Sequence, residues 1–259
     1  MATFLFDRIV YGPVYSRRLG VSLGVNLSPA DGKRCSFNCI YCECGLNEQR
    51  QSKQKAPCRE VVQQALEAKL LQMKDEDTCP EAITFSGNGE PTLHPEFAGI
   101  IDDTLEIRDR LCPEARVAVL SNSTMLHNES VFQALCKVDD AIMKLDSVFD
   151  SRIKQIDAPE IKDFSSAELV RQLCRLDGRL IIQTIFLRGV HDGVVIDNTC
   201  DEEVSAWIDA LKKINPRKVM IYTIDRETPV KSLQKISASE LETIAEQVRK
   251  EGIEVAFSV

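Results

Sequence analysis

The sequence Cys35-Ser36-Phe37-Asn38-Cys39-Ile40-Tyr41-Cys42 places three cysteines within eight residues. Thiolates this close together can bind one metal centre without ligands from distant parts of the chain. A cubane iron–sulfur cluster contains four irons, so three cysteine ligands leave one iron open. An open iron can hold a substrate or cosubstrate, whereas a site with four cysteines is coordinatively complete. The stretch therefore predicts a reactive iron–sulfur centre on a short loop rather than one that only stores electrons.

Two other interpretations of the cysteines stay open. Zinc also binds thiolates at these spacings, although no second Cys-x-x-Cys or Cys/His pair lies nearby to complete a tetrahedron. Cys44, two residues after Cys42, could act as a fourth ligand and close the cluster. The other six cysteines are scattered singly, and we expect most of them to be free thiols rather than disulfides: Cys58, Cys79, Cys112, Cys136, Cys174 and Cys200.

Length and composition indicate a single globular domain spanning residues 1–259. Hydrophobic residues make up 44% of the chain, and no Pro/Gly/Ser-rich linker divides it. It contains no run of about 18 apolar residues, so we expect no membrane span and no membrane partner. Residues 1–10 carry Asp7 and Arg8 within their apolar run, which argues against a signal peptide. Ten cysteines without a signal peptide favour a reducing compartment, and we expect a cytoplasmic protein.

Positive charge is concentrated around the cysteines. Residues 1–59 hold nine Lys/Arg and four Asp/Glu, a net charge of +5, which leaves −13 for the remainder of a chain whose total is −8. Such a basic region could attract an acidic electron-donor protein or a phosphorylated substrate. It could equally offset the negative charge of a thiolate-bound cluster. The acidic remainder disfavours extensive nucleic-acid contact, although a local patch could still bind RNA.

Strand and helix patterns alternate along most of the chain. Apolar runs predict seven strands, at residues 19–27, 82–85, 116–120, 141–145, 179–187, 218–224 and 253–257. Amphipathic segments between them predict helices, and Ser237 with Glu240 forms a capping box at the start of the last one. Repeated strand–helix units imply right-handed crossovers and a parallel sheet. Residues 1–18 are expected to be a lead-in with a turn at residues 11–14.

Polar residues gather where the predicted strands end, which favours a sheet that curls. They are Asn26, Ser86, Ser121, Asn122, Asp146, Arg188 and Asp225. In parallel barrels the C-terminal ends of the strands form a mouth that carries the site. We therefore predict an α/β fold, a parallel partial (β/α)6 TIM-like barrel, with the cluster loop at residues 35–42 directly after the first strand.

The cysteine triplet and a second loop, Gly87-Asn88-Gly89-Glu90-Pro91, together resemble the radical S-adenosylmethionine (radical SAM) superfamily. Within that superfamily, residues 11–45 are similar to the iron–sulfur oxidoreductase-like branch related to wybutosine-synthesising enzymes. This likeness rests on Tyr-Gly-Pro-Val at 11–14, Ser-Arg-Arg-Leu-Gly at 16–20 and Ser-Leu-Gly-Val-Asn-Leu at 22–27.

The resemblance implies an oxidoreductase with two cofactors, a [4Fe–4S] cluster and S-adenosyl-L-methionine (SAM). Cys35, Cys39 and Cys42 would ligate three irons, and the amino and carboxylate groups of SAM would chelate the fourth. In this superfamily the reduced cluster cleaves SAM to a 5′-deoxyadenosyl radical, which abstracts hydrogen from a substrate; the substrate here is unidentified. The alternative is an iron–sulfur electron-transfer or regulatory protein without SAM chemistry, in which Cys44 closes the site.

The resemblance also implies a set of SAM contacts. Tyr41 would lie near the adenine. The residues Gly87, Asn88, Gly89 and Glu90 correspond to the family's Gly-Gly-Glu loop, which binds the methionine amino group, but the extra Asn leaves open which glycine carbonyl does so. Candidates for ribose or carboxylate contacts at later strand ends are Ser121, Asn122, Lys144 and Asp146, and more weakly Gln183 and Thr184. For these residues, ordinary capping of strand ends is the alternative.

Three arginines are candidates for substrate contact. Arg17 and Arg18 could bind a substrate anion or pair with carboxylates, and Arg226 lies in a segment that could reach over the barrel mouth. The resemblance implies a low-potential electron donor such as a flavodoxin or ferredoxin. A tRNA base fits the resemblance and the basic N-terminal region, and a small molecule is the other expected substrate class.

Overall fold

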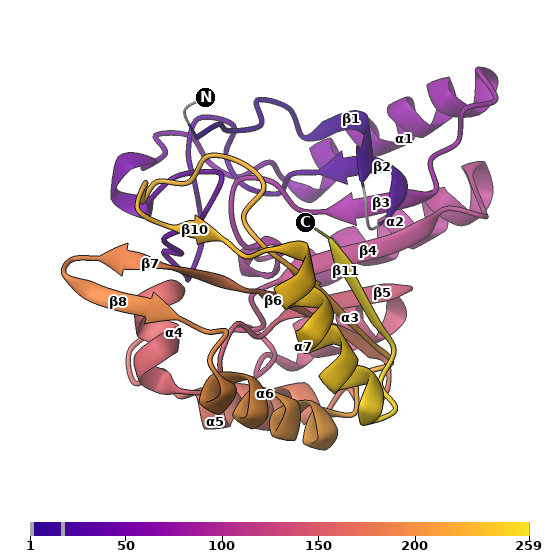
Figure 1. Ribbon diagram of the computed structural model, residues 1–259. Coiled ribbons are helices and arrows are strands. Elements are labelled where there is room, and N and C mark those ends of the chain that lie inside the picture. Colours follow the sequence, from indigo (N-terminus) through magenta and orange to yellow (C-terminus); the bar gives the residue numbers. More distant parts are fainter. Residues whose placement is uncertain (1–2, 17–18, 259) are drawn as a thin grey trace.

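The main sheet of the computed structural model, which describes residues 3–16 and 19–258, is a curled sheet of eight strands. These strands are β1 (Val10–Ser16), β2 (Gly20–Val25), β3 (Ala82–Phe85), β4 (Arg116–Ser121), β5 (Asp140–Lys144), β6 (Leu180–Ile185), β9 (Lys218–Tyr222) and β11 (Val255–Ser258). They follow one another in that order across the sheet (Figure 1). All pairings from β2 to β11 are parallel, and only β1 pairs antiparallel, with β2.

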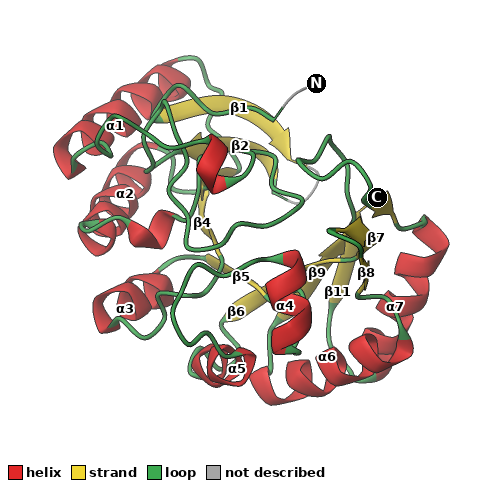
Figure 2. Cartoon of the chain, turned by 90° about the vertical axis from the view of Figure 1, so that its left-hand side faces the viewer, coloured by secondary structure: helices red, strands yellow, loops and turns green. Residues whose placement is uncertain are grey.

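The helices lie along the convex side of the sheet, as Figure 2 shows. They are α1 (Arg59–Asp75), α2 (Phe97–Leu111), α3 (Glu129–Lys137), α5 (Ser166–Cys174), α6 (Asp201–Ile214) and α7 (Ala238–Lys250). Each presents an apolar stripe to the sheet; in α1 the stripe is Val62, Leu66, Leu70 and Met73. The predicted capping box of Ser237 and Glu240 is confirmed at the start of α7. A shorter helix, α4 (Asp150–Ile156), follows β5.

The hydrophobic core fills the layer between the sheet and the outer helices. Its largest members include Phe85 and Phe97, which meet edge to face, and Phe186 and Trp207, which do the same. Burying a side chain of this kind contributes about 1.5–3 kcal/mol. This core holds the strand ends in place and leaves their C-terminal edge free to carry a site. No helix among the described residues is long and apolar enough to cross a membrane.

The predicted partial barrel is confirmed: six strand–helix units and a closing strand form a half-barrel that stays open between β1 and β11. Two predictions of local structure are wrong. Residues 11–14 are not a separate turn but part of β1, where Gly12 and Pro13 sit at a register shift in the pairing with β2. The strand predicted at residues 179–187 stops at Ile185 because the chain then turns into a separate sheet. That sheet contains β7 (Leu187–His191), β8 (Val194–Asp197) and β10 (Gln234–Lys235).

The expectation of free thiols needs one correction. Cys79 and Cys112 form a disulfide across a sequence separation of 33 residues. Cys79 lies just before β3 and Cys112 caps the end of α2, so the fold brings together two cysteines that the sequence spaces far apart. Cys58, Cys136, Cys174 and Cys200 are free.

Candidate functional site

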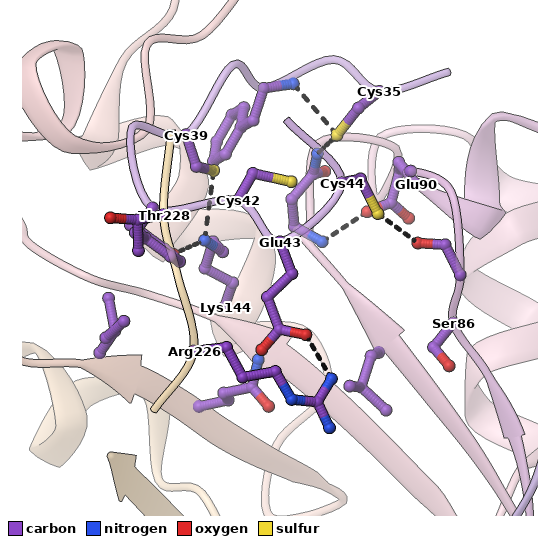
Figure 3. A pocket seen from close by; sticks show the side chains of 18 of the residues that line it. Cys35, Cys39, Cys42, Glu43, Cys44, Ser86, Glu90, Lys144, Arg226 and Thr228 are labelled. Carbon is purple, nitrogen blue, oxygen red and sulfur yellow. Dashed lines mark hydrogen bonds and ion pairs between the residues drawn. The ribbon is translucent and has the colours of Figure 1, made fainter. Parts of the chain in front are cut away.

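A cavity of about 380 Å³ opens at the C-terminal ends of the parallel strands (Figure 3). One wall is the cysteine loop, residues 35–44, and another is the loop at residues 86–90 after β3. The ends of β4, β5, β6 and β9 and the N-terminal residues Phe4 and Phe6 complete it. Parallel barrels carry their sites at this edge, and the volume falls within the ~300–1,000 Å³ of small-molecule sites.

Backbone hydrogen bonds hold the cysteine loop against the end of α4. The amide of Asn38 donates to the carbonyl of Asp157 at 2.9 Å, and the amide of Ile40 donates to that of Ile156 at 3.0 Å. Inside the loop, Asn47 Nδ2 donates to the carbonyl oxygens of Cys35 and Phe37 at 3.4 and 3.2 Å. The loop is therefore fixed in shape although it contains no helix or strand.

The same loop is clamped to the Gly/Glu loop through Arg34. Its amide donates to the carbonyl of Asn88 at 2.9 Å, and its own carbonyl accepts from the amide of Glu90 at 2.9 Å. Gly89, between them, has φ +138° and packs so closely that an added Cβ would collide with the carbonyl oxygen of Arg34. Glycine is needed here for both reasons. The two loops of the site are therefore locked together by their backbones.

The three cysteine sulfurs differ in their surroundings, as Figure 3 shows. Cys35 Sγ accepts from the amide of Phe37 at 3.5 Å, and Lys144 Nζ lies 3.5 Å from Cys39 Sγ. Burial raises the pKa of Cys35 to about 12 and that of Cys39 well above the usual value for a thiol. By contrast, a hydrogen bond from the thiol of Cys44 lowers the pKa of Cys42 to about 6.

The three cysteines line one cavity and have the chemistry that an iron–sulfur cluster needs. Buried thiols with raised pKa values lose their protons when a metal cation binds them. A cluster spreads its cysteines over different irons, so the three sulfurs need not converge on one ion.

Glu90 organises the strand-end residues beside it. Its buried carboxylate accepts from the amides of Thr92 and Asn122 at 3.0 and 2.6 Å and from Ser121 Oγ at 2.9 Å. Burial nevertheless raises the pKa of Glu90. Asn122 Nδ2 in turn donates to Ser36 Oγ at 2.9 Å, beside Cys35. Glu90 thus connects the ends of β3 and β4 to the cysteine loop.

A buried charge cluster lies below Cys39. Lys144 Nζ is 3.0 Å from Asp146 Oδ2 and 3.1 Å from Asp157 Oδ1, and Tyr41 Oη contacts both Lys144 and Asp146. Burial would lower the pKa of Lys144, but the two carboxylates outweigh it and hold that pKa well above its usual value. Burial raises the pKa of Asp157 to about 7. The arrangement keeps a lysine ammonium beside the cysteine sulfurs.

The structure brings most of the predicted site residues into this cavity and leaves others out. Those that line it are Cys35, Cys39, Cys42, Tyr41, Gly87, Gly89, Glu90, Ser121, Asn122, Lys144, Gln183 and Arg226. Asn88 does not, because its side chain bonds the backbone of Phe6 and the carbonyl of Pro29. Asp146 lies behind Tyr41 and Lys144. Arg17 and Arg18 lie outside the described residues.

Two segments meet at the rim of the cavity. Arg226 Nη1 pairs with Glu43 Oε2 at 2.7 Å, and its guanidinium lies 5.7 Å from the centre of the Phe4 ring (Figure 3). Both members of the ion pair are exposed, so the contact is weak. Arg226 is therefore at the mouth, as its sequence position suggested, but it contacts the cysteine loop rather than open solvent alone.

Sequence reasoning missed three residues of the site. Lys33 lines the cavity and donates to the carbonyl of Gly45 at 2.9 Å. Burial opposes the charge of Lys33, yet Cys42, Cys35 and Cys39 raise its pKa overall. Its position two residues before Cys35 was the signal that could have identified it. Asp157 had no such signal, because it reaches the site only through the fold. Tyr11 belongs to the Tyr-Gly-Pro-Val stretch at 11–14, but that stretch gives no indication that the ring lines the cavity.

Comparisons with known proteins agree with this geometry. A family model described as the Radical SAM superfamily matches residues 31–197. The UPF0026 protein of Helicobacter pylori (strain J99) is 32% identical over 237 residues, which cover 90% of this chain and 71% of the relative.

Solved structures extend the likeness of the fold. SuiB of Streptococcus suis bound to S-adenosylmethionine has a TM-score of 0.65 at 11% identity, over 91% of this chain and 50% of SuiB. TYW1 with a lysine-pyruvate adduct bound has a TM-score of 0.62 at 17% identity, over 88% of this chain and 73% of TYW1. The chain thus spans about half the length of SuiB. At these identities the likeness concerns the fold alone.

Proposed function

The chain belongs to the radical SAM superfamily, and from this premise we propose that its cysteine loop binds a [4Fe–4S] cluster for the reductive cleavage of SAM. Membership implies an enzyme with an iron–sulfur centre and SAM. The bound cofactors would supply a 5′-deoxyadenosyl radical, which would remove a hydrogen atom from a substrate carbon. The observation that carries the proposal is that the three cysteines and the Gly/Glu loop line one cavity at the barrel mouth.

The protein's own groups would hold these cofactors in place. Cys35, Cys39 and Cys42 would ligate the cluster, and the ammonium groups of Lys33 and Lys144 would balance its negative charge. Glu90 would keep the Gly/Glu loop and the end of β4 in register with the cysteines. The apolar rings of Phe4 and Phe6 line the cavity and would limit the access of water to the reaction.

SAM contacts follow from the residues that line the cavity. We assign direct contacts to Tyr41, Gly87, Gly89, Glu90, Ser121, Asn122, Lys144 and Gln183. Asp146 and Asn88 have supporting roles, because Asp146 orients Tyr41 and Lys144 while Asn88 anchors the loop to Phe6 and Pro29. All of these residues belong to one domain that we propose to span residues 1–259.

Anaerobic reconstitution tests the proposal. With iron, sulfide, dithionite and SAM, the protein should form a cluster and release 5′-deoxyadenosine, measured by chromatography. Cys39→Ala should lose both, whereas the matched control Cys136→Ala should keep both, because Cys136 is a free cysteine that does not line the cavity. A complete cluster without any 5′-deoxyadenosine would overturn the proposal.

One observation favours a second candidate function. Cys44 is buried and lines the same cavity, so a fourth thiolate is available to close the cluster. The protein would then be an iron–sulfur electron-transfer or regulatory protein. Electron paramagnetic resonance separates the two functions: added SAM should change the spectrum of an open cluster and leave that of a closed one unaltered.

The basic region around the cysteines supports an acidic electron donor as partner. A groove of about 750 Å³ is lined by residues from the segments 29–34, 51–58 and 94–96, and Lys33 lines both this groove and the cavity that holds the cysteines. Arg34, Lys53 and Lys55 are exposed beside it, and no described residue forms an ion pair with them. We propose that a low-potential flavodoxin or ferredoxin docks here, steered by its negative charge.

Charge reversal tests this docking site. Lys53→Glu combined with Lys55→Glu should slow cluster reduction by a reduced flavodoxin or ferredoxin about tenfold at low salt, because steering depends on charge. Reduction by dithionite should be unchanged. The matched control pair, Lys213→Glu with Lys250→Glu, lies on helices α6 and α7 and should have no effect on either. Equal slowing of cluster reduction by both charge-reversal pairs would overturn the proposed docking site.

The last part of the proposal concerns the substrate. A tRNA or a small molecule remains the proposal, and Arg226 at the mouth is the residue placed to contact it. Arg226→Ala should retain SAM cleavage and lose conversion of the substrate. Full conversion by this variant would remove Arg226 from the site. The roles suggested for Arg17 and Arg18 stay predictions.

A further inference from the structure

A second cavity, of about 130 Å³, lies inside the half-barrel next to the first. Four residues line both: Tyr11, Ser86, Leu120 and Gln183. The two cavities therefore share a wall, and we call the inner one the interior pocket. Figure 3 shows Ser86 at the edge of the larger cavity, away from Cys39.

Small residues at some positions leave room for the interior pocket, whereas bulky side chains fill the interior of complete parallel barrels. On β2, a Cβ at position 24 would overlap the ring of Tyr11, so Gly24 lets that ring lie across the interior. Ser22 and Thr84 on neighbouring strands add little volume. Tyr11 is held in this position by stacking on Phe6, with ring centres 3.8 Å apart.

The lining of the interior pocket is uncharged and combines apolar side chains with hydroxyl groups. The apolar ones are Val14, Leu19, Leu120, Ile142 and Met220. No charged side chain among the residues that the structure describes lines it. Its hydroxyl groups form two pairs, Ser22 with Thr84 at 2.7 Å and Tyr11 with Ser86 at 2.6 Å. Each pair uses one of its two hydroxyl protons, so each pair keeps one donor, together with unused lone pairs, for a ligand. Burial raises the pKa of Tyr11 to about 12, which keeps its phenol neutral.

We propose that the interior pocket binds the uncharged, hydrogen-bonding end of the substrate. A water-sized group occupies about 30 Å³, so the pocket has room for about four or five non-hydrogen atoms. This inference rests on the proposed function. A carboxylate or ammonium group here would have no charged partner among the described lining residues, and burying an unpaired charge is strongly unfavourable. The charged side chains Lys144, Glu43 and Arg226 line the larger cavity at the barrel mouth instead, where they can contact a charged part of the same molecule.

Three molecules with five non-hydrogen atoms each test the charge preference: propanamide, propanoate and butylammonium. Their binding to the reconstituted full-length chain can be measured by ligand-observed saturation-transfer NMR. Propanamide should bind at least about tenfold more tightly than either charged analogue, a difference of about 1.4 kcal/mol. Equal or tighter binding of a charged analogue, or no binding of propanamide, would overturn the proposal.

Two variants locate the binding. Ser22→Leu should fill the pocket and abolish propanamide binding. Tyr11→Phe keeps the volume, removes one hydroxyl and should weaken binding several-fold, so it remains informative if Ser22→Leu does not fold. Val194→Ala, on the exposed β7–β8 hairpin, should bind like the wild type. Propanamide binding unaffected by both pocket variants would also overturn the proposal.

The same samples report on the proposed function separately through release of 5′-deoxyadenosine from SAM. Cleavage of SAM without propanamide binding would overturn only the proposed role of the interior pocket in binding. Propanamide binding without cleavage would overturn the proposed function alone.

Discussion

The thiol of Cys44 donates a hydrogen bond to the carbonyl oxygen of Gly87 at 3.3 Å. Cys44 thus connects the cysteine loop to the Gly/Glu loop, and its thiol also bonds Cys42, which raises the pKa of Cys44. The contact with Gly87 therefore gives the Cys44 thiol a role in holding the two loops together that does not depend on binding iron.

The first prediction concerns this thiol. Cys44→Ala should retain the cluster, measured by iron content and visible absorbance, because three ligands remain. Its reduction potential should fall, since hydrogen bonds to cluster sulfurs favour the reduced state. Cys44→Ser keeps a donor and should have a potential closer to that of the wild type. Loss of iron from Cys44→Ala to the extent seen for Cys39→Ala would identify Cys44 as a ligand.

The second prediction uses two glycines with positive φ. At Gly89 an added methyl group would collide with the carbonyl oxygen of Arg34, so Gly89→Ala should separate the two loops and prevent cluster assembly. Gly193, with φ +76°, has no atom within 4 Å of an added Cβ. Gly193→Ala should therefore cost only backbone strain of roughly 1 kcal/mol and leave iron content unchanged. Equal iron content in both variants would contradict the clamp.

Local patterns explain how much of this site could be predicted from the sequence. The metal-binding cysteines lie within eight residues, and their spacing carries the information. The parallel strands have apolar runs of the right length, because both faces of such strands are buried. The Gly/Glu loop follows the second of these strands directly. Each of these features depends on neighbouring residues only.

The missed features depend on contacts between distant parts of the chain. Asp157 meets Cys39 across 118 residues, at 3.3 Å, because α4 packs under the cysteine loop. Cys79 and Cys112 pair because the end of α2 returns to the start of β3. Gly12 and Pro13 predict a turn that includes Tyr11, and only the pairing of β1 with β2 places the Tyr11 ring inside the barrel.

The third prediction concerns the buried charge cluster. Lys144→Met would leave Asp146 and Asp157 without their cation, and removing one member of a buried ion pair costs about 3–5 kcal/mol. Urea unfolding should show a loss of this order. The same substitution at Lys154, which is exposed on α4, should change the free energy of unfolding by less than about 0.5 kcal/mol. Equal stability of the two variants would mean that the cluster does not stabilise the fold.

The fourth prediction is a pH dependence. The hydroxyl of Ser237 donates to Glu240 at 2.6 Å and Arg188 pairs with it at 2.6 Å, and together they lower the pKa of Glu240 to about 2. The unfolded carboxyl titrates near 4.5. Because the folded pKa is the lower one, the ionised carboxylate stabilises the protein above pH 4.5, and this contribution disappears as the pH falls toward 2.

Glu240→Gln should therefore be less stable than the wild type at pH 7, by about 1 kcal/mol for a weakened helix cap. The partly exposed ion pair with Arg188 adds little because solvent screens it. The difference should shrink steadily between pH 4.5 and pH 2, as measured by urea unfolding at several pH values. Glu246→Gln, exposed on the same helix, is the matched control and should show no such trend. A difference that stayed constant down to pH 2 would mean that the side-chain shape of Glu240, and not its charge, stabilises the start of α7.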